Sequence, residues 1–214
     1  SYMGIHESQS RFMRTFLEEI RISGFRFMQR CRKNDHSFRT FRWMNFIKEV
    51  NHVRNSFIRT EADELTYCFH IILRYEIEKA IFRDHVKVEE LPALWNQKMQ
   101  EYLQITPADD AEGILQDMHW SDGSFGYFPS YLLGSIYDGM YLDRLEEELG
   151  SVDALLAEGR ISEITKWLNE KIHQYGSTRS PKEVIRYVCG KEVSAEPLIR
   201  YFKEKYTKMF IILG

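Results

Sequence analysis

The chain has 214 residues, of which 43% are apolar and 14% aromatic, and this composition excludes a disordered or low-complexity protein. Twenty-nine basic residues nearly balance 32 acidic ones, so we expect no nucleic acid as a general partner. There is no long apolar run and no basic, apolar leader, so we expect no membrane association either. Three widely spaced cysteines without a C-x-x-C pair favour a reducing cytoplasm.

Leucine, isoleucine and charged residues recur at spacings of three and four, which predicts a mainly α protein. We expect helices at about 61–83, 91–103, about 131–149, 161–175, 181–189 and 194–209. Three glycines and a proline among aromatic residues at 121–134 predict an ordered turn or a short strand pair near 121–130. Without an internal repeat or a long linker, residues 1–214 are expected to form one helical unit.

The segment HESQSR at 6–11 contains the first candidate metal ligands. His6 and Glu7 would point about 100° apart on a helix, so both could not face one ion without distortion. One of them is therefore a candidate ligand. A solvated helix start is the alternative interpretation.

The segment from about Glu61 to Arg83 is apolar on nearly every side, which is typical of a helix surrounded by other helices. Arg59, Asp63, Thr66 and His70 follow one another at steps of four, three and four, so they would line one helix face. Buried charges are costly unless they are paired or face a ligand. The stripe therefore fits either an internal ion pair beside a hydrogen-bonded histidine or a surface that faces a substrate.

A second polar group precedes the aromatic turn, in GILQDMHWSDGSFGYFP at 113–129. Gln116, Asp117, His119 and Tyr127 supply an amide, an acid, an imidazole and a phenol. Such groups can hydrogen-bond a polar reaction centre. A histidine that serves only the fold is the alternative here.

Together, HESQSR at 6–11, IRTEAD at 58–63 and GILQDMHW at 113–120 resemble, in that order, three motifs of the carboxypeptidase Taq family of zinc metallocarboxypeptidases. These motifs are H-E-S, I-R-x-x-A-D and G-x-x-Q-D-x-H-W. The resemblance extends from Ile47 to the end of the chain. It implies the bundle-like, helical C-terminal portion of a zincin-type enzyme that removes single residues from peptide C-termini. It also implies peptide substrates, zinc and a homodimer.

The resemblance assigns roles to individual residues. Arg59 is expected to bind the terminal carboxylate of the substrate, as a guanidinium fork does well. His119 and Tyr127 are the candidate catalytic residues, stabilising the developing oxyanion or binding the substrate backbone. The residues expected to orient these groups or the metal ligand are His6, Asp63, Gln116 and Asp117.

The zinc site is expected to be incomplete. In the family, a helical H-E-x-x-H supplies two histidine ligands and the general base, and the glutamate of H-E-S is the third ligand, which implicates Glu7. No two of the seven histidines here stand four apart. Because that motif precedes H-E-S in the family, we expect the N-terminal half of the fold to be missing and the isolated chain to be inactive. The alternative is a non-catalytic helical remnant, or an interaction domain whose partner supplies the missing half.

Residues 13–46 depart from the family. Seven basic residues stand against one acid between Arg21 and Asn45, which could indicate a basic loop or a nucleic-acid patch. We interpret the segment instead as an out-of-frame translation. Back-translation with one T restored gives FYENFLGRNKDFWVPIYAKMQEKR, in which the family continuation E-N-x-x-G-R returns, and a second shift rejoins the frame at Phe46. The DNA across codons 12–46 tests this, because an intact sequence without both shifts would contradict it.

Overall fold

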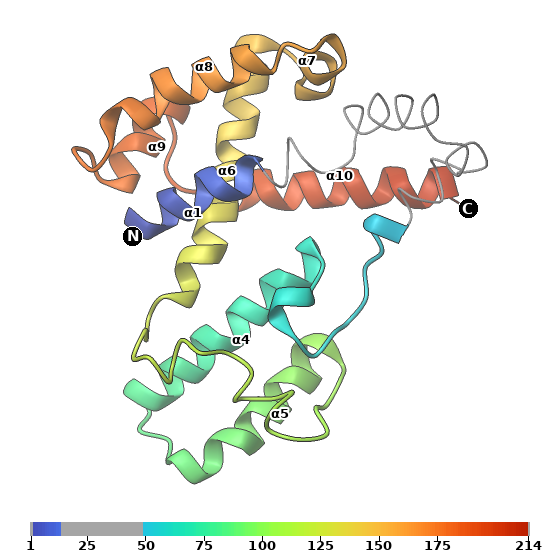
Figure 1. Ribbon diagram of the computed structural model, residues 1–214, viewed down its shortest axis with the longest axis vertical. Helices are drawn as coiled ribbons and strands as arrows, with labels where there is room; N and C mark the ends of the chain where they lie inside the picture. The colour runs from blue at the N-terminus through green and yellow to red at the C-terminus, as the bar shows by residue number, and fades with distance from the viewer. Residues whose placement is uncertain (1, 14–48, 214) are drawn as a thin grey trace, which may run out of the picture. The chain divides into compact units, whose positions relative to one another are not determined.

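The structure is a computed structural model that describes residues 2–13 and 49–213, with side chains at 3–13 and 49–207. Eight α-helices lie in these residues and no strand does (Figure 1). They are α1 (Tyr2–Phe12), α4 (Glu64–Phe82), α5 (Leu91–Leu103), α6 (Phe128–Leu149), α7 (Val152–Glu158), α8 (Ile161–Lys171), α9 (Pro181–Cys189) and α10 (Glu196–Leu213). Three short 3-10 turns, η3 (Arg59–Glu61), η4 (Val88–Glu90) and η5 (His173–Tyr175), complete the set. The mainly α prediction is confirmed.

The described residues divide into two compact units. Residues 51–132 form one, here called the middle unit, and residues 2–13, 49–50 and 133–213 form the other, here called the terminal unit. The expectation that residues 1–214 act as one part of a larger catalytic domain stays a prediction. The segment expected to be out of frame, 13–46, lies outside the described residues except for Met13.

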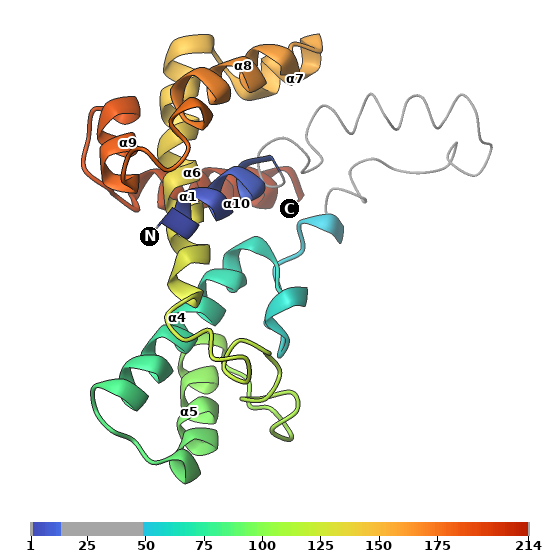
Figure 2. The same cartoon turned by 60° about the vertical axis from the view of Figure 1, so that its left-hand side comes forward.

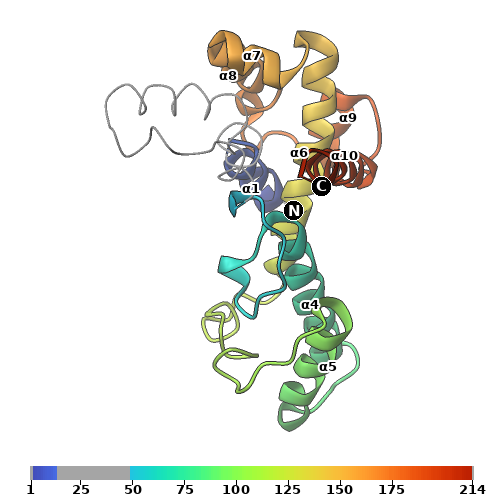
Figure 3. The same cartoon turned by 90° about the vertical axis from the view of Figure 1, so that its right-hand side faces the viewer.

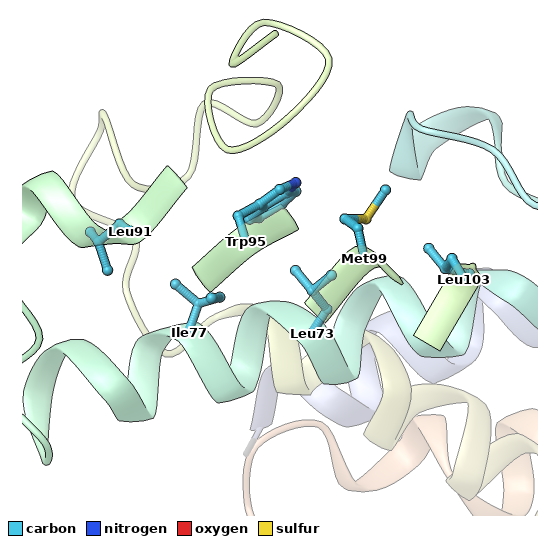
Figure 4. Close-up of a cluster of buried hydrophobic side chains, with 6 residues drawn as sticks. All are labelled: Leu73, Ile77, Leu91, Trp95, Met99 and Leu103. Atoms are coloured by element: carbon cyan, nitrogen blue, oxygen red, sulfur yellow. The ribbon is translucent and has the colours of Figure 1, made fainter. Parts of the chain in front are cut away.

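The middle unit is built on the contact between α4 and α5. Leu73 and Ile77 of α4 face a stripe on α5 whose members recur every four residues (Figure 4). These α5 residues are Leu91, Trp95, Met99 and Leu103, and each is buried. The bounds of α5 match the predicted helix at 91–103. A spacing of four places side chains on one helix face, which is why these four residues form one buried stripe.

Helix α4 begins later than the sequence predicts. Asp63 is its N-cap, and the carboxylate Oδ1 accepts the N–H groups of Leu65 at 3.0 Å and Thr66 at 2.9 Å. An aspartate in this position satisfies N–H groups that lack partners within the helix. Arg59 lies before the cap, in the separate turn η3. The interpretation of Arg59, Asp63, Thr66 and His70 as one continuous helix face is therefore wrong.

Residues 121–127 form turns, and the strand pair considered for this region is wrong. The backbone N–H of Ser124 donates to the carbonyl of His119 at 2.7 Å, and that of Asp122 donates to the carbonyl of Met118 at 3.0 Å. Gly123 and Gly126 have φ values of +82° and +78°, a conformation that glycine adopts without steric cost. Helix α6 then starts at Phe128, three residues before the expected start.

The terminal unit confirms the expected helix ends in α9. Ser180 caps the helix in a reciprocal capping box with Glu183, Pro181 follows in the first turn, and Gly190 ends the helix in the left-handed conformation. Other features differ from the prediction. Helix α8 ends at Lys171, before the separate turn η5, and α10 runs from Glu196 to Leu213 instead of 194–209. Helix α7 is an additional helix that the sequence does not predict.

Helix α1 lies beside α6 within the terminal unit (Figure 2 and Figure 3). The hydroxyl of Ser8 donates to Asp138 Oδ1 at 2.5 Å, and Arg11 Nε donates to the Ser135 hydroxyl at 2.7 Å. Gly134 permits this approach, because a Cβ at that position would lie 2.9 Å from the backbone nitrogen of Ser8. Within the described residues, none of the helices is both long and apolar enough to cross a membrane.

Candidate functional site

Two arginines share one carboxylate in the middle unit. Arg59 donates to Asp117 Oδ1 from Nε at 3.0 Å and from Nη2 at 2.7 Å, and Arg74 Nε donates to Asp117 Oδ2 at 2.6 Å. Arg59 is 7% exposed and Arg74 is fully buried. Because isolated charges are costly inside a protein, the shared carboxylate is what allows both guanidinium groups to be buried.

Gln116 connects the same two arginines from the neighbouring position. Its Oε1 accepts the backbone N–H of Arg59 at 2.9 Å and Arg74 Nη2 at 2.8 Å. Its Nε2 donates to the carbonyls of Phe57 and Glu112, both at 2.9 Å. The amide therefore joins the segment before α4 to the loop after α5. The supporting roles predicted for Gln116 and Asp117 would act through these contacts.

The Arg59 guanidinium lies among aromatic rings. Its central carbon is 5.9 Å from the ring centroid of Tyr67, 5.5 Å from that of Phe128 and 5.3 Å from that of Tyr131. Nη1 also donates to the Tyr67 hydroxyl at 3.1 Å. Aromatic faces attract cations, so the rings favour the charged group while limiting its motion.

The site carries one net positive charge. Burial alone would raise the pKa of Asp117, but the hydrogen bond from Arg59 and the charge of Arg74 hold that pKa below its usual value. Asp117 is therefore ionised at neutral pH. One carboxylate between two guanidinium groups leaves a positive charge that an anion can neutralise.

His119 adjoins this cluster and is neutral at neutral pH. Burial, and next the charge of Arg59, lower its pKa below the usual 6.5. Its Nε2 lies 3.0 Å from the Tyr131 hydroxyl, and its ring centroid lies 4.4 Å from that of Phe128 and 5.8 Å from that of Tyr127. A neutral imidazole and a phenol can each donate one hydrogen bond to a polar group.

The structure thus brings together Arg59, Asp117, His119 and Tyr127, while Asp63 has a different environment. Besides capping α4, Asp63 accepts the Thr66 hydroxyl at 2.8 Å and the Arg54 N–H at 3.1 Å on Oδ2. These contacts join Asp63 to the start of α4 and to the segment before it. The orienting role predicted for Asp63 would act through this cap.

His6 and Glu7 lie on α1, in the terminal unit; His6 is exposed and Glu7 is half-buried. In the part of the chain that the structure describes, no three His, Cys, Asp or Glu side chains are grouped so that they could hold a metal ion. The donors described here therefore do not fit a zinc site by themselves, because protein zinc sites use at least three protein ligands.

Sequence reasoning missed Arg74 and Tyr131. Arg74 stands four residues after His70 within an apolar helix, and a charged residue there requires a buried partner. Tyr131 lies in the first turn of α6 and Tyr127 directly precedes that helix, and both rings lie near His119. The sequence shows where these two residues stand, but it does not identify the residues that they contact.

His70 makes the fold sensitive to acid. It is fully buried, and burial, followed by the charges of Arg74 and Arg59, lowers its pKa to about 3, although nearby Asp117 acts in the opposite direction. The unfolded chain takes up this proton near pH 6.5 while the folded one does not, so stability present above that pH is lost as the pH falls toward 3. Between pH 7 and pH 5, the wild type is expected to lose about 2 kcal/mol more unfolding free energy than His70→Asn.

Urea titrations at the two pH values measure this difference. His52→Gln is the matched control, because His52 is exposed, and it should lose as much stability as the wild type. Equal losses in the wild type and in His70→Asn would show that His70 is not the group responsible.

Comparison with known proteins gives a consistent set of matches. The model of the family described as carboxypeptidase Taq (M32) metallopeptidase matches residues 1–206. Carboxypeptidase 1 of Bacillus subtilis (strain 168) is 46% identical over 211 residues, a match that covers 98% of this chain and 42% of that protein. Thermostable carboxypeptidase 1 of Thermus thermophilus is 38% identical over 210 residues, covering 97% of this chain and 41% of that protein.

A solved structure agrees with these matches. The M32 carboxypeptidase from Deinococcus radiodurans R1 is 28% identical, with a TM-score of 0.92, over 97% of this chain and 42% of that one. The chain therefore spans about two fifths of the length of the relatives it matches.

Proposed function

Because the chain belongs to the carboxypeptidase Taq (M32) metallopeptidase family, we propose that it carries the carboxylate-binding part of a cytoplasmic zinc metallocarboxypeptidase. Such an enzyme would remove single residues from peptide C-termini. The observation that carries the proposal is the Arg59 cluster, which combines a buried, ring-enclosed guanidinium with one net positive charge.

Arg59 is proposed to bind the terminal carboxylate of the peptide. Nε and one N–H of Nη2 are directed at Asp117, and Nη1 donates to Tyr67, so each terminal nitrogen still has a second N–H for a ligand. A guanidinium can donate two parallel hydrogen bonds to a carboxylate. His119 and Tyr127, next to it, are proposed to donate to the substrate backbone or to the oxyanion formed from the scissile carbonyl.

Glu7 is the proposed zinc ligand from this chain. Since the described donors do not fit a complete metal site, the remaining ligands must come from outside the described residues. We therefore propose that the isolated chain cleaves no peptide. Cleavage that appears only on adding the N-terminal part of a family member, with zinc bound by the mixture, would support a split site; tight zinc binding and cleavage by the chain alone would contradict it.

Binding of a blocked dipeptide tests the carboxylate site without any metal. Titration calorimetry would compare the free acid with its C-terminal amide on the full chain. The free acid is expected to bind at least about tenfold more tightly, because the amide cannot accept charge-assisted hydrogen bonds from Arg59. Equal affinity for the two peptides would exclude the proposed function.

A further inference from the structure

Helix α4 contains a second buried charged residue, Glu78, which stands one turn after Arg74 on the same helix face. It is 6% exposed, so its carboxylate needs hydrogen-bond donors. Oε1 accepts the indole N–H of Trp120 at 2.9 Å and the backbone N–H of Gly126 at 3.0 Å. One oxygen of α4 thus holds two points of the loop between α5 and α6.

Both points adjoin the proposed catalytic residues. Trp120 directly follows His119, and Gly126 directly precedes Tyr127. The first part of the loop closes on itself, because the N–H groups of Asp122 and Ser124 donate to the carbonyls of Met118 and His119. The N–H of Phe125 also donates within the loop, to the carbonyl of Gly123 at 2.9 Å, whereas the N–H of Gly126, the next residue, donates to Glu78 on α4. The bond from Gly126 to Glu78 therefore ties the second part of the loop to the helix.

Packing reinforces the attachment at Trp120. Its ring centroid lies 6.0 Å from that of Trp95 in the α4 and α5 core and 6.3 Å from that of Phe125, which stacks on it. The indole ring is therefore held between the helix core and the loop. With its N–H bound to Glu78, the backbone at residue 120 has a fixed position beside His119.

We propose that Glu78 is the positioning residue for His119 and Tyr127, acting through its hydrogen bonds to Trp120 and Gly126. The proposal rests on the proposed function in one respect, namely that the two positioned groups face a peptide. Two residues of α4 then hold different parts of the loop. Arg74 binds Gln116 and Asp117, which contact Arg59, and Glu78 binds the residues next to the proposed proton donors.

Three variants of the full chain test this assignment. Glu78→Leu removes both hydrogen bonds, whereas Glu78→Gln keeps an amide oxygen that can accept both. Glu76→Leu is the matched control, because Glu76 lies on the same helix but pairs with Lys98 at a partly exposed position. NMR would record the His119 and Tyr127 ring signals, and calorimetry would record affinity for the blocked dipeptide acid.

Glu78→Leu is expected to shift both ring signals and to weaken acid binding by about tenfold. Glu78→Gln and Glu76→Leu should keep the wild-type ring positions and bind within about twofold of wild type. If Glu78→Leu does not fold, Trp120→Phe removes one of the two bonds and should still shift the His119 signals.

Unchanged ring signals in Glu78→Leu, or in Trp120→Phe if that variant replaces it, would overturn the proposal. The proposal would also be overturned if Glu78→Gln shifted the ring signals and weakened acid binding as much as Glu78→Leu does. The charge of Glu78, rather than its hydrogen bonds, would then be responsible. The ring signals are recorded without the dipeptide, so they test the role of Glu78 independently of ligand binding. If the wild type fails to bind the dipeptide acid, the proposed function fails, and the NMR comparison still decides the role of Glu78.

Discussion

Replacing Arg74 by methionine is expected to lower the free energy of unfolding by about 3 to 5 kcal/mol. Arg74 is fully buried and donates to Asp117, Gln116 and the carbonyl of His70. Methionine fills similar space but donates no hydrogen bond, so Arg59 would be the one charged partner left to Asp117 among the residues that the structure describes. Urea titration followed by circular dichroism measures the change.

Lys98→Met is the matched control for this experiment. Lys98 also pairs with α4, through Glu76, but the two side chains are 21% and 32% exposed. Pairs of that kind contribute at most about 1 kcal/mol. Similar stability losses in the two variants would contradict the view that the Arg74 network holds the middle unit together.

Replacing Arg59 by methionine is expected to weaken binding of the blocked dipeptide acid by about thirtyfold or more, because a desolvated guanidinium supplies roughly 2 kcal/mol or more to such a pair. Arg59→Lys should also bind more weakly than the wild type, since an ammonium keeps the charge but loses the planar fork. Affinity for the amide should change little in either variant. Titration calorimetry with both peptides measures these differences.

Arg83→Lys provides the comparison for Arg59. Arg83 lies in the same unit and pairs with Asp84, but its side chain is 67% exposed and takes no part in the site. The Arg83→Lys variant should bind the acid and the amide with the affinities of the wild type. Binding of the acid by Arg59→Met within twofold of wild type would mean that another group recognises the carboxylate.

Features set by neighbouring residues could be predicted from the sequence. The capping serine, first-turn proline and terminal glycine of α9 all act within a few residues of the helix, and the buried stripe of α5 follows from its own periodicity. A terminal glycine, Gly159, also ends α7, just after Leu155 and Leu156. One short apolar group gives a periodicity too weak to predict this helix from the sequence.

Features that depend on distant partners could not be predicted in this way. Asp117 lies 43 residues from Arg74 and 58 from Arg59, and no local pattern announces such a contact. The predicted start of α4, at about residue 61, is wrong for a related reason. An aspartate such as Asp63 can either continue a helix or cap it, and here it caps the helix. Arg59, Asp117 and His119 lie together in the structure. The contacts of their segments with Arg74, Glu78 and Tyr131 join residues far apart in the chain or follow no local pattern, so the sequence does not predict them.

The contact of α1 with α6 has a consequence for the order of folding. Ser8 and Asp138 are 130 residues apart in the chain, and closing so long a loop costs entropy that later contacts must offset. A helix of 11 residues is also marginal on its own in water. We therefore expect α1 to join the assembly last, after the surface beside Gly134 has formed, so that the segment bearing Glu7 acquires its native position only at the end of folding.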